Sequence, residues 1–155
     1  MVAGPDELGH EAEMKKLCKE LELEKTVCFT GPLHGEEKRA ALGGSELFVL
    51  PSFSEGFSMA ILEAAAAGLP VLMTPQCNFP ELVKAGAALE VAPDAEGCAA
   101  GLRQLLDASE ADRRAMGRRG SDLVARDYTW SRVAEQMLAV YQWVLGDGGK
   151  PECVI

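Results

Sequence analysis

The segment LFVLPSFSEGFSMAILEAAAAGLPVLM, residues 47–73, places one apolar helix between two short apolar strands. Strands that are apolar throughout and alternate with helices are typical of a parallel sheet that is covered on both faces. The segment therefore predicts an α/β fold. Its expected elements are a strand at 47–50, a helix at 58–67 that Gly68 closes, and a strand at 71–73.

The same alternation continues on both sides of this segment. Residues 1–5 resemble the end of a strand followed by a turn, and further strands are expected at 26–30 and 89–91. Between them we expect helices at 7–22, 35–43 and 80–84. From Asp94 onwards only helices are expected, at 94–107, 109–126 and 129–145, with Thr129 as the N-cap of the last. We expect one domain over residues 1–145, followed by a flexible tail at 146–155.

The composition excludes several classes of protein. No apolar run approaches the ~20 residues that span a bilayer, so no membrane association is evident, and no signal peptide is visible. The five cysteines form no C-x-x-C pair, which argues against a disulfide framework or a zinc site. A cytoplasmic location is therefore expected, with a peripheral place at the inner membrane as the alternative for a full-length protein. The net charge of −9 argues against a nonspecific nucleic-acid binder.

Two glutamates stand out, because burying a carboxylate without a partner costs several kcal/mol. Glu55 lies in a loop, whereas Glu63 lies in a helix that we expect to be buried on every side. Glu63 lies ~7–8 Å beyond the helix start, where Ser58 is a candidate N-cap. A phosphate at the helix start and two sugar hydroxyls at Glu63 would fit this separation. A salt bridge, or a place on an exposed helix edge, would also explain Glu63.

Three segments are expected at the edge of the sheet where the strands end. They are the turn at Gly31, the loop 52–57 and the loop 74–79. Doubly wound sheets bind their ligands across this edge. The three segments are therefore candidates for one site.

An ordered set of motifs resembles a known family. Glu55-Gly56-Phe57 and Glu63 form a pair of glutamates separated by seven residues, and Ala64, Gly68 and Pro70-Val71 follow. This pattern resembles the signature of the family 4, GT-B-type retaining glycosyltransferases. Nearly the whole chain takes part, because five further motifs stand in the family's order: Val2-Ala3-Gly4-Pro5, Val27-x-Phe29-x-Gly31, Leu47-Phe48-Val49-Leu50-Pro51-Ser52, Pro80-Glu81-Leu82 and Tyr128-Thr129-Trp130.

The resemblance implies one half of a GT-B fold, namely a C-terminal, Rossmann-like domain that binds a nucleotide sugar. Glu63 would hold the ribose hydroxyls of the donor, and Glu55 would orient the transferred sugar as the catalytic candidate. The other expected donor-binding residues are Gly56, Phe57 and Ser58 at the diphosphate, Gly31, Pro32 and Leu33 at the base, and Asn78 in the loop 74–79 near the sugar. The transfer would retain configuration and serve glycan, glycolipid or polysaccharide synthesis.

No cofactor is expected, because the nucleotide-diphosphate sugar is a substrate. No metal is expected either. The resemblance implies metal-independent chemistry, in which helix N-termini and basic side chains stabilise the leaving diphosphate. The sequence agrees, since it has no Asp-x-Asp, and His10 and His34 are isolated. Lys38 and Arg39 are expected on a solvated face.

The resemblance also implies that important parts of the enzyme lie upstream of Met1. These are the rest of the first strand, the basic residues and loop that bind the diphosphate, and the N-terminal acceptor domain. We expect the isolated chain to bind nucleotide weakly and not to turn over. We also expect Trp130, Tyr141 and Trp143 to lack cover and to promote self-association, which light scattering would detect.

Two other classes of function stay open. A non-catalytic module that binds a nucleotide or a protein would keep the fold and could keep Glu63. A nicotinamide-dependent dehydrogenase half is disfavoured, because no G-x-G-x-x-G follows a strand.

Overall fold

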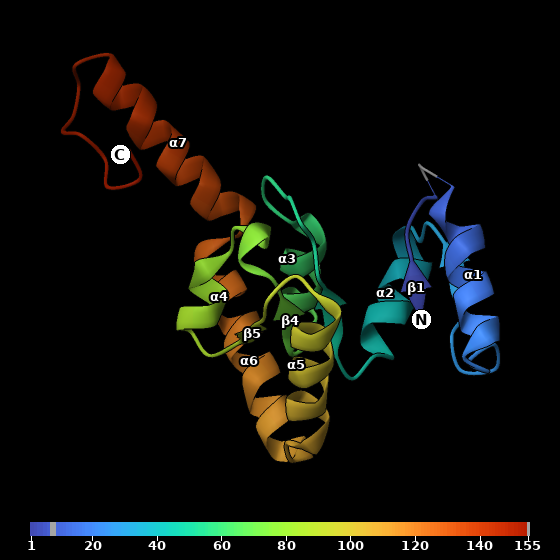
Figure 1. Cartoon of the computed structure of the whole chain (residues 1–155). Coiled ribbons are helices and arrows are strands. Elements are labelled where there is room, and N and C mark those ends of the chain that lie inside the picture. Colours follow the sequence, from blue (N-terminus) through green and yellow to red (C-terminus); the bar gives the residue numbers. More distant parts are fainter. Residues whose placement is uncertain (7–8, 155) are drawn as a thin grey trace. The chain divides into compact units, whose positions relative to one another are not determined.

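The computed structural model describes residues 1–6 and 9–154 of the chain. These residues form two compact units, Met1–Gly44 and Ser45–Ile155 (Figure 1). The expected single domain over 1–145 stays a prediction. So does the flexible tail at 146–155, whose last residue lies outside the described residues.

The first unit contains a two-stranded parallel sheet, made of β1 (Val2–Ala3) and β2 (Phe29–Gly31), and two helices, α1 (His10–Glu20) and α2 (Gly35–Gly43). The predicted strand at 26–30 is wrong in its first half. The backbone N–H groups of Thr26 and Val27 both donate to the carbonyl of Leu23, so these residues form a turn. The expected start of the first helix, at residues 7 and 8, lies outside the described residues.

The second unit is built on a three-stranded parallel sheet in the order β3-β4-β5. The strands are β3 (Phe48–Leu50), β4 (Val71–Met73) and β5 (Ala88–Glu90). The central strand β4 is buried along its whole length, as expected for an apolar strand that is covered on both faces. The α/β class and the parallel pairing are therefore confirmed, with the strands shared between two sheets.

The helices of the second unit begin and end within one or two residues of the predicted positions. They are α3 (Met59–Ala66), α4 (Pro80–Lys84), α5 (Ala95–Asp107), α6 (Glu110–Asp127) and α7 (Trp130–Val144), with a 3-10 turn η1 (Pro75–Cys77) after β4. Local capping explains the agreement, because the side chains at the N-cap positions accept a backbone N–H of the first turn. This holds for Asp94, Ser109 and Thr129.

The predicted burial of α3 on every side is wrong. Ile61, Ala64 and Ala65 are buried, but Met59 and Ala60 are exposed. The buried face packs on α6, where a Cβ added at Gly120 would lie 3.5 Å from the Cβ of Ala65. The difference has a physical reason: an alanine costs little at the surface, so an alanine-rich helix does not have to be covered all round.

The last helix, α7, extends away from the sheet of the second unit (Figure 1). None of its residues is buried. The expected exposure is confirmed for Trp130, which is 89% exposed, and for Tyr141, whereas Trp143 is half-buried. Self-association through this surface stays a prediction. No helix among the described residues is long and apolar enough to span a bilayer.

Candidate functional site

Two loops lie side by side at one edge of the second unit. The segment 52–57 follows β3, and the segment 74–79 follows β4. Because β3 and β4 are parallel neighbours, both loops leave the sheet at the carboxyl ends of their strands. We call these two segments the paired loops. The structure thus brings together two of the three segments that are predicted to share a site.

Three hydrogen bonds connect the paired loops. The Oγ1 of Thr74 donates to the carbonyl of Ser52 at 2.5 Å, and the backbone N–H of Glu55 donates to the carbonyl of Gln76 at 3.1 Å. The side-chain amide of Asn78 donates to the carbonyl of Glu55 at 2.5 Å. The two loops therefore form one connected structure, and Glu55 is its centre.

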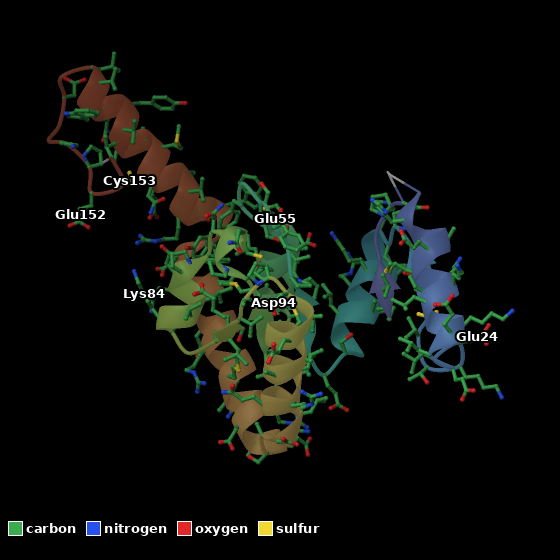
Figure 2. All side chains as sticks on the ribbon, in the orientation of Figure 1. Glu24, Glu55, Lys84, Asp94, Glu152 and Cys153 are labelled. Carbon is green, nitrogen blue, oxygen red and sulfur yellow. The ribbon has the colours of Figure 1, made fainter. Side chains whose placement is uncertain are left out.

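Glu55 is labelled in Figure 2, on the loop that precedes α3. Its side chain is half-buried. The backbone around it is fixed on both sides, because Glu55 donates through its N–H and accepts through its carbonyl. The carboxylate thus projects from a held peptide rather than from a free loop, as expected of a side chain that orients a ligand.

The start of α3 directly follows this loop. Ser58 is buried and is the N-cap, and its Oγ accepts the N–H of Ile61 at 3.4 Å, which confirms the predicted cap. The N–H groups of Met59 and Ala60 have no acceptor within the helix, as at every helix start. Together with the helix dipole, they make this end attractive to an anion.

Glu63 lies on the same helix, one turn beyond its start. The residue is half-buried and takes part in an interaction within the protein, so it is not the isolated buried carboxylate that its apolar neighbours suggest. A half-buried carboxylate can accept hydrogen bonds from hydroxyl groups, and its own desolvation costs much less free energy than that of a fully buried carboxylate.

An aromatic cluster supports the loop 52–57. Phe57 lies 5.0 Å from Phe79 and 6.0 Å from Tyr128 between ring centroids, and Phe79 and Tyr128 meet edge to face at 5.0 Å. Phe79 is fully buried, whereas Phe57 keeps 43% of its surface exposed. Sequence reasoning missed this cluster, since Tyr128 entered only as part of a motif and no periodicity links the three positions.

The titration of the Tyr128 hydroxyl tests whether the aromatic cluster covers this side chain. Burial raises the pKa of its hydroxyl above the ordinary value of 10.0, and the carboxylates of Glu81 and Asp127 raise this pKa further. The folded chain therefore holds this proton more tightly than the unfolded chain. Tyr128 contributes stability below about pH 10 that is lost as the pH rises through its folded pKa.

The chain has two tyrosines, so the variant Tyr141→Phe isolates Tyr128. We expect ultraviolet titration of this variant to show tyrosine ionisation above pH 10.0. In Tyr128→Phe the loss of stability on moving from neutral to strongly alkaline pH should become smaller. An ordinary pKa in the folded Tyr141→Phe variant would show that the ring of Tyr128 is not covered in solution.

The predicted base-binding residues Gly31, Pro32 and Leu33 belong to the first unit. Gly31 has a positive φ of 68°, and its carbonyl accepts the N–H of Gly4 at 3.0 Å, which ties the end of β2 to the turn after β1. Their role at a nucleotide base stays a prediction.

The described residues contain no cluster of His, Cys, Asp and Glu that could hold a metal ion. A hollow of about 480 Å³ lies in the first unit, beside Cys18, Lys25 and Cys28. None of the predicted site residues lines it, so it gives no support to the predicted donor site.

The sequence of this chain is similar to those of known proteins of one family. A sequence model described as "Glycosyl transferases group 1" matches residues 1–122. The chain is 34% identical over 131 residues to an MMP alpha-(1->4)-mannosyltransferase of Mycolicibacterium hassiacum, covering 83% of this chain and 32% of the relative. It is 31% identical over 142 residues to a D-inositol 3-phosphate glycosyltransferase of Salinispora tropica, with 89% and 29% covered. The chain spans about a third of the length of the curated relatives it matches.

Solved structures show the same likeness. A sucrose-phosphate synthase from Thermosynechococcus elongatus superposes with a TM-score of 0.79 at 26% identity, covering 94% of this chain and 38% of that one. The C-terminal domain of a group 1 glycosyl transferase, LpcC from Francisella tularensis, superposes with a TM-score of 0.68 at 25% identity. In that case 81% of this chain and 66% of the other are covered.

Proposed function

This chain belongs to the group 1 family of glycosyl transferases, and from that premise we propose that it is the donor-binding part of a retaining glycosyltransferase. The substrate bound here is a nucleotide-diphosphate sugar, and the whole enzyme transfers the sugar to an acceptor in glycan, glycolipid or polysaccharide synthesis. The observation that carries the proposal is the order of three features along one segment. They are Glu55 on the paired loops, the capped start of α3 and Glu63 one turn further on.

Each feature suits one part of such a donor. The carboxylate of Glu55 accepts hydrogen bonds from hydroxyl groups of the transferred sugar, and the N–H groups at the start of α3 donate hydrogen bonds to the diphosphate. Glu63, which lies ~7–8 Å beyond the helix start, accepts hydrogen bonds from the two hydroxyls of the ribose. Gly56 suits a place beside the diphosphate, because it has no side chain to block the approach of a phosphate oxygen.

The reaction needs stabilisation of the negative charge that builds up on the leaving diphosphate. The N-terminus of α3 supplies fixed backbone donors and a partial positive charge at that point, without any rearrangement during the reaction. We assign the binding site for the acceptor and the remaining basic groups to the rest of the enzyme, since this chain spans about a third of the length of the curated relatives it matches. The isolated chain is therefore expected to bind the donor weakly and not to turn it over.

A binding panel tests the proposal. Calorimetry or ligand-observed NMR with UDP-glucose, GDP-mannose and ADP-glucose should show that one of the three bases is preferred. NADH, which carries the adenosine diphosphate of ADP-glucose but no hexose, serves as the control and should bind no more tightly than ADP-glucose. If none of the three nucleotide sugars bound at millimolar concentration, the donor-binding assignment would be wrong. Binding of nucleoside diphosphates with no contribution from the sugar would instead favour a non-catalytic nucleotide-binding module.

A further inference from the structure

We infer that Asn78 is a positioning residue for Glu55. Its side-chain amide holds the Glu55 peptide at the place from which the carboxylate reaches the sugar of the donor. The inference rests on the proposed function, and it assigns Asn78 a role that acts through Glu55. A direct contact between Asn78 and the donor is not needed.

The Glu55 peptide is held from two sides by one short stretch of chain. Its N–H donates to the carbonyl of Gln76 at 3.1 Å, and its carbonyl accepts the amide of Asn78 at 2.5 Å. Because the N–H and the carbonyl of Glu55 belong to the two peptide groups that flank its Cα, neither peptide group can rotate without breaking a hydrogen bond to the neighbouring loop. The direction in which the Glu55 side chain leaves the backbone is therefore set by the loop 74–79.

The loop 74–79 is in turn fixed to the core. Thr74 and Cys77 are fully buried, and they bond to Ser52, two residues beyond β3, and to Leu50, the last residue of β3. The Oγ1 of Thr74 donates to the carbonyl of Ser52 at 2.5 Å, and the Sγ of Cys77 donates to the carbonyl of Leu50 at 3.4 Å. Asn78 thus connects the loop 52–57 to a loop that the buried residues Thr74 and Cys77 hold in place.

The loop keeps two local features that cost free energy. Asn78 has a left-handed backbone, with φ 54° and ψ 42°, which asparagine adopts more readily than most non-glycine residues but still at a cost in free energy. Among the described residues, the Oε1 of Gln76 is buried without a hydrogen-bond partner. A loop free to relax would lose both features, so the bonds across the paired loops hold it in place. Such costs are typical of segments that position functional groups.

Two substitutions remove the side-chain bond in different ways. Asn78→Gly keeps the left-handed backbone without strain and deletes the amide, whereas Asn78→Asp keeps the side-chain shape but replaces the donor with an acceptor. In both variants we expect hydrogen exchange of the Glu55 amide to rise about 5- to 10-fold, the net effect of one hydrogen bond. Exchange in β3, β4 and β5 should stay unchanged. Glu22→Gly is the matched control, because Glu22 is the other non-glycine described with a positive φ.

Binding then tests whether the held peptide matters for the sugar. We expect Asn78→Gly to lower the affinity for the preferred nucleotide sugar while the affinity for the matching nucleoside diphosphate is kept. The double variant Asn78→Gly/Glu55→Ala should bind no more weakly than Glu55→Ala alone, since both changes remove the same contact.

The outcomes separate the two proposals. Unchanged exchange of the Glu55 amide in both Asn78 variants would overturn the inference whether or not any nucleotide binds. Additive losses in the double variant would overturn it as well, because Asn78 would then act independently of Glu55. A chain that shows the expected exchange but binds no nucleotide would refute the proposed function, and with it the role of Asn78 toward a donor.

Discussion

Gly117→Ala is expected to lower the free energy of unfolding of the second unit by about 3 kcal/mol, at the upper end of what overpacking costs. A Cβ built on Gly117 would lie 1.8 Å from the carbonyl oxygen of Gly68 and 2.7 Å from its carbonyl carbon. Both are backbone atoms, so no side chain can turn away to make room. Either α6 or the end of α3 must shift, and α3 carries Glu63.

Gly120→Ala is the matched control for this prediction, because it lies on the same helix and also faces α3. There the added Cβ would meet the side chains of Ala65 and Ala87 at 3.5 Å, which is an ordinary contact distance. Alanine has the better helix propensity at both positions, by about 1 kcal/mol. Gly120→Ala should therefore be neutral or stabilising. Urea unfolding followed by circular dichroism measures both variants, and equal effects would show that the close approach at Gly117 does not exist in solution.

Glu63→Ala is expected to weaken the binding of the preferred nucleotide by about 100-fold or more, which abolishes measurable binding in a weak binder. Two hydrogen bonds from ribose hydroxyls to a carboxylate are lost, and bonds to charged groups contribute about 1.5–3 kcal/mol each. The substitution also removes the interaction that Glu63 makes within the protein, so circular dichroism of the variant checks that the fold is kept. Calorimetry at high protein concentration, or ligand-observed NMR, provides the measurement.

Two controls make the result specific to the ribose. A nucleoside diphosphate that lacks both ribose hydroxyls should bind the parent chain and Glu63→Ala with the same affinity. Glu96→Ala, which removes an exposed carboxylate from the first turn of α5 in the same unit, should bind the intact nucleotide like the parent. Undiminished binding of the intact nucleotide by Glu63→Ala would mean that the ribose lies elsewhere.

The segment that carries Glu55, Ser58 and Glu63 shows how much a local motif predicts. All three residues stand out in one short stretch of sequence, and the cap at Ser58 is confirmed. The separation of Ser58 and Glu63 follows from the rise of an α-helix alone. The predicted burial of Glu63 is wrong, because the apolar neighbours of a helical residue do not reveal which face of the helix is covered.

Contacts across the fold are beyond the reach of sequence reasoning. The stacking of Phe57 on Tyr128, the bond from Asn78 to Glu55 and the approach of Gly117 to Gly68 each join residues that are far apart in the chain. None of them belongs to a repeating pattern. Each depends on how two surfaces fit together. In the sequence, the only sign of such a contact is the identity of a single residue, such as a glycine without a side chain.

The alternation of strands and helices, and the residues where most helices begin, follow from the sequence alone, because hydrophobic periodicity and capping act between neighbours along the chain. The start of β2 is the exception, since Thr26 and Val27 favour a strand locally but are held in a turn by bonds to Leu23. Which face of α3 is covered, and what holds Glu55 in place, arise when α3 packs on α6 and the loop 74–79 bonds to the loop 52–57. Those interactions depend on the packing of the whole unit, which no local pattern encodes.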